Sequence, residues 1–180
     1  TGTELKGKKV GIHAYGNVGR LVAEKAKAMG MQVCAFDPFV PADKMEAEGV
    51  KAMQTIEELY SNCNYVSLHI PANDQTKNSI NYELLSKMPK GACLVNTARK
   101  EVINEADMAK LLADRPDFKY VTDIAAGNSE ELSAFAPRYF ATPKKMGAQT
   151  AEANLNAGLA AANQIVDFIK NGVTKFQVNK

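Results

Sequence analysis

The turn formed by residues 14–19 has the clearest chemical meaning in this sequence. It joins an apolar run, residues 9–13, to a helical pattern that begins near Val18. Small residues let backbone N–H groups approach a pyrophosphate, and the positive N-terminal end of the helix faces that anion. Gly16 marks the start of the helix, and Gly19 allows the helix to pack closely on the strand. The spacing predicts a dinucleotide-binding turn, with an ordinary strand-to-helix turn as the alternative.

Asp37 lies about twenty residues after this turn, at the end of a second apolar run, residues 32–36. A carboxylate at this place can accept hydrogen bonds from both hydroxyls of an adenosine ribose. It would repel a 2′-phosphate, and the following Pro38 and Phe39 offer no arginine to compensate. The turn and the carboxylate together predict NAD as the cofactor, in preference to NADP. The alternative is that Asp37 caps a helix or a turn.

Strand-like and helix-like segments alternate along the chain. Several strand-like runs are continuously apolar, which is typical of parallel strands covered on both faces. The alternation predicts an α/β fold, a Rossmann-like doubly wound parallel sheet, with the first strand central and the cofactor at the carboxyl ends of the strands. No linker divides the chain. Strands are predicted at residues 9–13, 32–36, 50–53, 65–70, 92–96, 120–123 and 138–141, and helices at residues 18–29, 56–61, 82–86, 106–113 and 150–170.

The composition excludes several functional classes. A formal net charge of +2 and the lack of basic runs argue against nucleic-acid and membrane partners. No apolar run reaches the roughly 20 residues that span a bilayer, and no secretory signal opens the chain. Cys34, Cys63 and Cys93 are odd in number, and we interpret them as reduced core residues, not as disulfides or metal ligands. A cytoplasmic location without a metal site is therefore expected.

Three further blocks carry a family resemblance: residues 66–71 (VSLHIP), 94–99 (LVNTAR) and 142–153 (TPKKMGAQTAEA). In this order after the glycine turn, they resemble the NAD-binding domain of D-2-hydroxyacid dehydrogenases. The resemblance covers nearly the whole chain, and the Asn-Thr-Ala-Arg block is its most specific part. It implies that residues 1–180 form a cofactor-binding domain, and that the substrate-binding domain is absent from this chain. It also implies an NAD-dependent oxidoreductase that acts on a small-molecule 2-hydroxy acid.

The resemblance assigns roles to single residues. It implies that Arg99 binds the substrate carboxylate, for which a guanidinium offers a bidentate fork. Tyr15 either covers the cofactor or only packs within the turn, and His13 is interpreted as structural. The other cofactor-binding residues that the resemblance implies are Gly16, Asn17 and Val18 at the pyrophosphate, Asp37 at the ribose, His69 and Pro71 in the cleft wall, Thr97, Ala98 and Arg99 near the nicotinamide, Asp123 at its carboxamide, and Gly147 in the last block.

Two positions depart from the family pattern. The family usually has a histidine after Thr-Pro as general acid or base, and Lys144 and Lys145 stand there instead. Members of the family also usually have a glutamate that keeps this imidazole protonated. In this sequence the position of that glutamate falls on Asn128. A lysine needs the opposite adjustment, because its ordinary pKa of about 10.4 must fall toward neutrality. The joint change predicts Lys144, or else Lys145, as the acid or base; the alternative is lost catalysis with retained NAD binding.

The resemblance also implies a substrate and an assembly state. D-3-phosphoglycerate is the expected substrate, oxidised to 3-phosphohydroxypyruvate for serine synthesis. One alternative is another D-2-hydroxyacid dehydrogenase, such as a glyoxylate or hydroxypyruvate reductase. The other is a noncatalytic NAD-sensing interaction module. Because members of the family pair through their cofactor domains, a homodimer is expected.

Overall fold

Residues 2–179 are described by the computed structural model, in which the chain forms two compact units. The first unit ends at Lys144 and the second begins at Lys145. This division differs from the undivided chain expected from the sequence. It has a packing reason, because the long helix α7 (Ala151–Asn171) of the second unit buries none of its residues.

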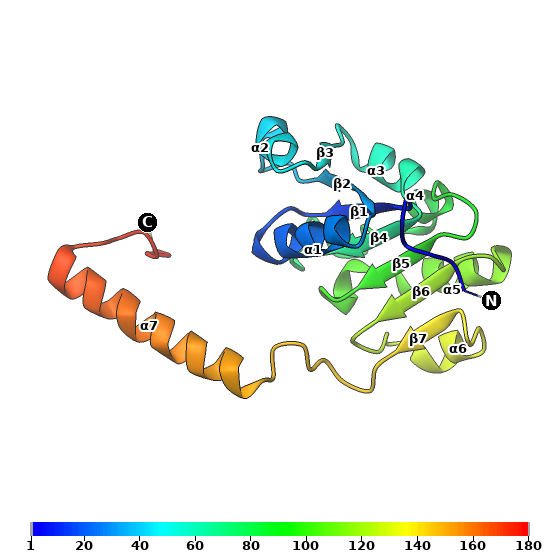
Figure 1. The fold of residues 1–180 in the computed structure, drawn as a ribbon. Coiled ribbons are helices and arrows are strands. Elements are labelled where there is room, and N and C mark those ends of the chain that lie inside the picture. Colours follow the sequence, from blue (N-terminus) through cyan, green and yellow to red (C-terminus); the bar gives the residue numbers. More distant parts are fainter. Residues whose placement is uncertain (1, 180) are drawn as a thin grey trace. The chain divides into compact units, whose positions relative to one another are not determined.

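A seven-stranded parallel sheet forms the centre of the first unit (Figure 1). The strand order is β3-β2-β1-β4-β5-β6-β7, so the direction of winding reverses between β1 and β4. In open sheets of this kind, ligands bind at the carboxyl ends of the strands beside such a reversal. The strands are β1 (Lys9–His13), β2 (Gln32–Phe36), β3 (Lys51–Ala52), β4 (Tyr65–Leu68), β5 (Cys93–Asn96), β6 (Lys119–Thr122) and β7 (Tyr139–Ala141).

Helices cover both faces of this sheet. Successive residues of a strand point to opposite faces, and on β1 a side chain at Gly11 would meet Leu59 of α3, whereas Ile12 contacts Gly19 of α1. Helices α1 and α3 therefore lie on opposite faces, as a doubly wound sheet requires. The helices of the first unit are α1 (Asn17–Ala28), α2 (Ala42–Ala47), α3 (Ile56–Asn62), α4 (Tyr82–Ser86), α5 (Glu105–Asp114) and α6 (Ser129–Ser133), with a 3-10 turn at Lys100–Val102.

The predicted fold class is confirmed, and all seven predicted strands are present within two residues of their predicted ends. Strand β1 lies inside the sheet, one place from its middle strand β4. Helices α2 and α6 were not predicted, because six and five residues are too few to show a helical period. The three cysteines are buried and free, in agreement with their interpretation as core residues.

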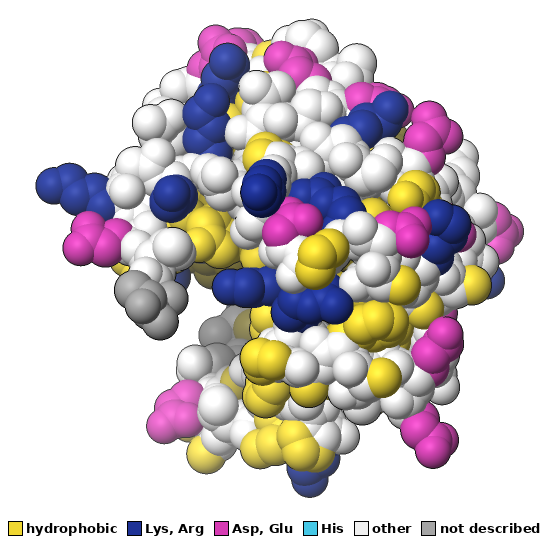
Figure 2. Space-filling view, turned by 90° about the vertical axis from the view of Figure 1, so that its right-hand side faces the viewer, with side chains coloured by type: hydrophobic (Ala, Val, Ile, Leu, Met, Phe, Trp, Pro, Cys, Tyr) yellow, Lys and Arg dark blue, Asp and Glu magenta, His cyan; other side chains and the backbone are white. Residues whose placement is uncertain are grey.

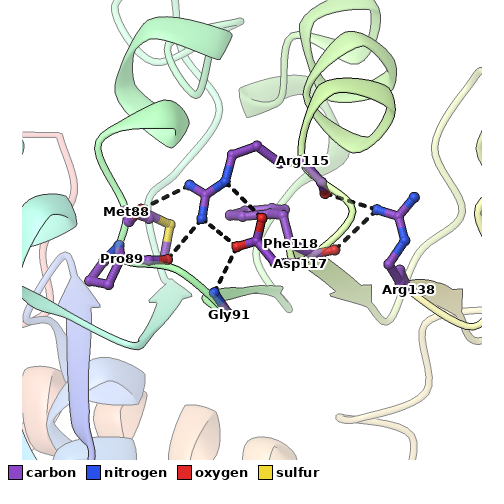
Figure 3. Close-up of polar contacts among 7 residues, drawn as sticks. All are labelled: Met88, Pro89, Gly91, Arg115, Asp117, Phe118 and Arg138. Atoms are coloured by element: carbon purple, nitrogen blue, oxygen red, sulfur yellow. Dashed lines mark hydrogen bonds and ion pairs between the residues drawn. The ribbon is translucent and has the colours of Figure 1, made fainter.

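An arginine–aspartate pair joins two connections at the amino ends of β5 and β6 (Figure 3). The Arg115 guanidinium donates to the carbonyl oxygens of Met88 and Pro89, at 2.8 and 2.9 Å, and to Oδ2 of Asp117 at 2.6 Å. The Gly91 N–H donates to the same carboxylate oxygen at 2.7 Å. The hydrogen bond from Arg115, followed by the one from Gly91, lowers the pKa of Asp117 to about 2. This pair stabilises the sheet end that lies away from the candidate site.

The second unit consists of α7 and the residues on either side of it. The Thr150 hydroxyl accepts a hydrogen bond from the Ala153 N–H at 3.0 Å, and Gly172 ends the helix in the left-handed conformation, with φ of 65°. This confirms the helix predicted at residues 150–170, with each end displaced by one residue. Within residues 2–179, no helix combines the length and the apolar character needed to cross a membrane. On the face drawn in Figure 2, basic and acidic side chains are interspersed.

Candidate functional site

The N-terminus of α1 is open to an anion. Gly16 precedes the helix with an extended backbone, no side chain caps its first N–H groups, and the first turn contains no acidic residue. These N–H groups follow the carboxyl end of β1 directly, beside the reversal of the sheet (Figure 1). The positive end of the helix and its unpaired N–H groups suit a phosphate.

Gly19 is required by the close approach of helix and turn. A Cβ atom at this position would lie 2.3 Å from the Ala14 carbonyl oxygen and 3.0 Å from Cγ2 of Ile12. A backbone oxygen cannot move aside as the end of a side chain can. The third glycine position of the turn therefore has the packing role that its spacing predicts.

Ala14 stands at the first glycine position of the turn and has a φ of 77°. The left-handed region costs an L-residue with a Cβ atom roughly 1–2 kcal/mol. The chain therefore keeps the turn conformation without the glycine that usually allows it. Local strain of this kind lies where the backbone must approach a ligand closely.

Asp37 lies against the turn, as the sequence predicted. Its Oδ2 accepts a hydrogen bond from the Tyr15 N–H at 2.8 Å, and its Oδ1 accepts one from the Phe39 N–H at 2.8 Å. A carboxylate has about four acceptor positions, so two remain for ribose hydroxyls. Beside it lies a hollow of about 310 Å³ whose walls include Val40 and Met53. A hollow lined by both apolar and polar groups, next to a carboxylate with free acceptor positions, is compatible with the adenosine part of a dinucleotide.

The side chain of Tyr15 packs within the protein and does not extend over the turn. It is 2% exposed, and its hydroxyl donates to Oε2 of Glu48 at 2.7 Å. Burial and this hydrogen bond raise the pKa of Tyr15 to about 12. The structure thus favours packing over the alternative in which the ring covers the cofactor. A contact between the Tyr15 backbone and NAD stays a prediction.

Two histidines lie at the carboxyl ends of β1 and β4. Nδ1 of His13 lies 3.1 Å from the Tyr60 hydroxyl, and Nε2 of His69 lies 3.0 Å from the Ser67 hydroxyl. Burial lowers the pKa of His13 to about 4 and lowers the pKa of His69. A lowered pKa makes each ring a weaker base, which suits a structural His13 and a cleft-wall His69 better than proton transfer.

Asn96 shapes the loop that presents Arg99. It is fully buried at the end of β5, its Oδ1 accepts from the Ala98 N–H at 3.0 Å, and its Nδ2 donates to the Arg99 carbonyl at 3.0 Å. The Arg99 guanidinium is exposed, and its Nη1 donates to the Ala98 carbonyl at 2.9 Å. No role was predicted for Asn96 from the sequence. A side-chain amide at the end of a buried strand, three residues before Arg99, is a signal for a residue that holds the following loop by hydrogen bonds.

Comparison with known proteins decides the family. Residues 1–144 match the family model described as D-isomer specific 2-hydroxyacid dehydrogenase, NAD binding domain. The chain belongs to this family. NAD is therefore the cofactor of this dehydrogenase domain, as the turn and Asp37 predicted; its preference over NADP stays a prediction.

Several relatives of this dehydrogenase domain are phosphoglycerate dehydrogenases. The NAD⁺-bound 3-phosphoglycerate dehydrogenase of Entamoeba histolytica is 44% identical, with a TM-score of 0.88 over 100% of this chain and 57% of that chain. The D-3-phosphoglycerate dehydrogenase of Bacillus subtilis is 32% identical over 94% of this chain and 32% of its own length. The hydroxypyruvate reductase of Thermotoga maritima is 31% identical over 91% of this chain and 54% of its own length. The dehydrogenase domain thus spans about a third to just over half of these relatives.

The remaining predicted residues of the dehydrogenase domain fall into two groups. Those of the first unit follow the carboxyl ends of the strands. Among them, the Asp123 N–H donates a hydrogen bond to the Asn96 carbonyl of β5 at 3.2 Å. Lys145 and Gly147 belong to the second unit, whereas Lys144 is the last residue of the first and is exposed. Their roles stay predictions. The first group comprises Gly16, Asn17 and Val18 after β1, Pro71 after β4, Thr97, Ala98 and Arg99 after β5, Asp123 after β6, and Lys144 after β7.

Proposed function

We propose that this domain is part of a longer protein and that this longer protein oxidises D-3-phosphoglycerate to 3-phosphohydroxypyruvate with NAD. The observation that carries the proposal is the 44% identity, over the whole of this chain, to the NAD⁺-bound 3-phosphoglycerate dehydrogenase of Entamoeba histolytica. The D-3-phosphoglycerate dehydrogenases of Bacillus subtilis and Haemophilus influenzae support the same substrate class, at 32% and 33% identity.

The residues of this domain divide the chemistry between them. Arg99, on the loop clamped by Asn96, binds the substrate carboxylate through two parallel hydrogen bonds. Lys144 removes the proton from the C2 hydroxyl, a role that needs its side-chain nitrogen as the neutral amine. Asp37 and the N-terminus of α1 would hold the adenosine and pyrophosphate ends of NAD. The bound cofactor would supply the hydride-accepting chemistry that the oxidation at C2 requires.

A substrate panel on the longer protein tests this function. NAD reduction is measured with D-3-phosphoglycerate, D-glycerate, D-lactate and glycolate, and NADH oxidation with hydroxypyruvate and glyoxylate. D-3-phosphoglycerate should have the highest kcat/KM. Preference for hydroxypyruvate would instead favour a reductase like that of Thermotoga maritima, which is 31% identical. Binding of NADH without turnover of any of these acids would contradict the enzyme function and favour an NAD-sensing module.

We also propose that the protein is a homodimer. Helix α7 exposes a set of large apolar side chains, which is typical of a surface that packs against another chain or domain. Sedimentation velocity of the longer protein should show a dimer, and a monomer at high concentration would contradict it. The cytoplasmic location stays a prediction. The exposed apolar residues of α7 are Leu155, Leu159, Ile165, Val166, Phe168 and Ile169.

A further inference from the structure

Glu48 follows α2 and forms hydrogen bonds with both the glycine turn and α1. Its Oε2 accepts from the Tyr15 hydroxyl at 2.7 Å and from Nε of Arg20 at 3.1 Å, and its Oε1 accepts from Nη2 of Arg20. Its backbone carbonyl accepts from Nζ of Lys27, in the last turn of α1. The hydrogen bonds from Arg20 and Tyr15 lower the pKa of Glu48, so its carboxylate is charged near pH 7. One residue therefore joins the end of α2 to the turn and to two places along α1.

Tyr15 is held at both ends by hydrogen bonds. Its hydroxyl donates to Glu48, and its backbone N–H donates to Oδ2 of Asp37 at 2.8 Å. Between these two contacts the ring is buried in a hydrophobic cluster. The preceding Ala14 has a φ of 77°, a region that alanine does not favour. The direction of the Tyr15 N–H thus depends on contacts outside the turn itself.

The hydroxyl of Tyr15 is not required by the cofactor roles described above. A dinucleotide-binding turn contacts its ligand through backbone N–H groups, and a phenyl ring would fill the same place in the core. Burying a hydroxyl lowers stability unless a hydrogen bond compensates it. Here the acceptor is a charged carboxylate, which forms shorter and stronger hydrogen bonds than a neutral acceptor. The hydrogen bond between Tyr15 and Glu48 is therefore suited to fixing the turn.

We propose that Glu48 is a positioning residue for NAD, whose hydrogen bond to the Tyr15 hydroxyl fixes the turn so that the Tyr15 N–H directs Asp37 toward the adenosine ribose. This inference rests on the cofactor-binding part of the proposed function and does not depend on which acid is the substrate.

The sign of the effect separates positioning from a simple effect of charge. Glu48 carries a negative charge beside the turn that leads into α1, and such a charge repels a pyrophosphate. Electrostatics alone therefore predicts tighter NAD binding when Glu48 is made neutral. Loss of positioning predicts weaker binding.

The test measures the Kd of the longer protein for NADH and for ADP-ribose, which has the adenosine and pyrophosphate parts but no nicotinamide. E48A should raise both Kd values by the same factor, about 3- to 10-fold, as for loss of one hydrogen bond. E48Q keeps an oxygen that can accept from the Tyr15 hydroxyl, so it should bind both ligands at least as tightly as the parent. Glu46 is exposed in α2, and E46A is the matched control, because it removes the same charge and leaves the Tyr15 hydrogen bond in place.

A double-mutant cycle tests whether Glu48 acts through Tyr15. Y15F removes the same hydrogen bond from the other side and should weaken binding by a similar factor. The double variant Y15F/E48A should bind no more weakly than E48A, because both changes remove one interaction. Additive losses would show that Glu48 acts by another route and would overturn the inference.

A purely structural Glu48 gives a different pattern. Both Kd values would then be unchanged in E48A and Y15F even though thermal melting showed lower stability, and this result overturns the inference. Tighter binding by E48A, or binding by E48Q as weak as that by E48A, overturns it as well. Should E48A not fold, Y15F decides, because weaker binding supports the role and unchanged binding refutes it. Normal NADH affinity of D37A refutes the inference together with the role of Asp37, whereas weakened binding by D37A with normal binding by Y15F refutes the inference alone.

Discussion

The Tyr15 N–H and the Asp37 carboxylate are joined by a hydrogen bond of 2.8 Å that links the glycine turn to the end of β2. Residues 22 positions apart in the sequence are thus held together at the carboxyl end of the sheet. The bond places the Asp37 carboxylate beside the turn that leads into α1, where the predicted contact with a ribose requires it.

Asp37 should determine the choice between NAD and NADP. D37N keeps a side-chain oxygen that can accept the Tyr15 N–H, but it removes the charge that repels a 2′-phosphate. Calorimetric titration should show NADH bound well ahead of NADPH in the unmodified protein, with a smaller gap in D37N. D37A should lose the turn contact as well and weaken NADH binding further. Equal affinity of the unmodified protein for both cofactors would refute the role of Asp37.

Replacing Ala14 with glycine should stabilise the protein. Glycine adopts a φ of 77° without steric cost, and the gain of roughly 1–2 kcal/mol is partly offset by the greater entropy of the unfolded chain. We expect A14G to raise the free energy of unfolding by about 0.5–1 kcal/mol. N78G is the matched control, because Asn78 also has a positive φ, 54°, and asparagine tolerates that region far better than alanine. Urea denaturation that shows A14G less stable than the parent would contradict the strain at Ala14.

Gly19 and Gly158 form a second matched pair. G19A places a Cβ atom 2.3 Å from the Ala14 carbonyl oxygen, so it should displace α1 from the turn, lower stability by about 1–3 kcal/mol and weaken NADH binding. At Gly158 in α7 a Cβ atom has no neighbour within 4 Å, so G158A should increase the helical content of α7. Circular dichroism and NADH titration check both variants. Unimpaired NADH binding by G19A would argue against a close approach of α1 to the Ala14 carbonyl oxygen.

Stability should fall at acid pH through Asp117. The folded pKa of this carboxyl is about 2, below its ordinary value of about 3.9. Its contribution is therefore complete above about pH 4 and is lost as the pH falls from about 4 toward 2. Urea denaturation across this pH range should show that the free energy of unfolding falls less steeply with decreasing pH for D117N than for the parent. Equal slopes for the two proteins would mean that the pair with Arg115 adds no acid sensitivity.

Lys144 should act on chemistry and not on cofactor affinity. In the longer protein, K144A should lower kcat by about 10²-fold or more, the lower end of typical acid–base contributions, with the Kd for NADH unchanged. K145A is the paired variant, since the two lysines are adjacent in the sequence. Loss of turnover in K145A together with normal turnover in K144A would assign the acid–base role to Lys145. Normal turnover in both variants would end the lysine hypothesis.

Much of the fold could be predicted because its signals are local. Continuous apolar runs marked the strands, and the helical pattern of residues 150–170 marked α7 to within one residue at each end. The division after Lys144 could not be predicted in this way. The apolar spacing of α7 indicates a helix that packs, but it does not say against which surface, and among the described residues 2–179 none of α7 is buried.

The sequence by itself determined the fold class, the family and the positions of the turn and Asp37, because these depend on residue types at fixed spacings along the chain. Only the tertiary structure decided how single side chains are used. The Tyr15 hydroxyl donates to Glu48 and the Asn96 amide holds the Arg99 loop, whereas the Asn128 Oδ1 has no hydrogen-bond partner among residues 2–179. The physical reason is that a hydrogen bond between distant residues depends on direction as well as on distance. Directions are set only when the strands, helices and loops have packed together.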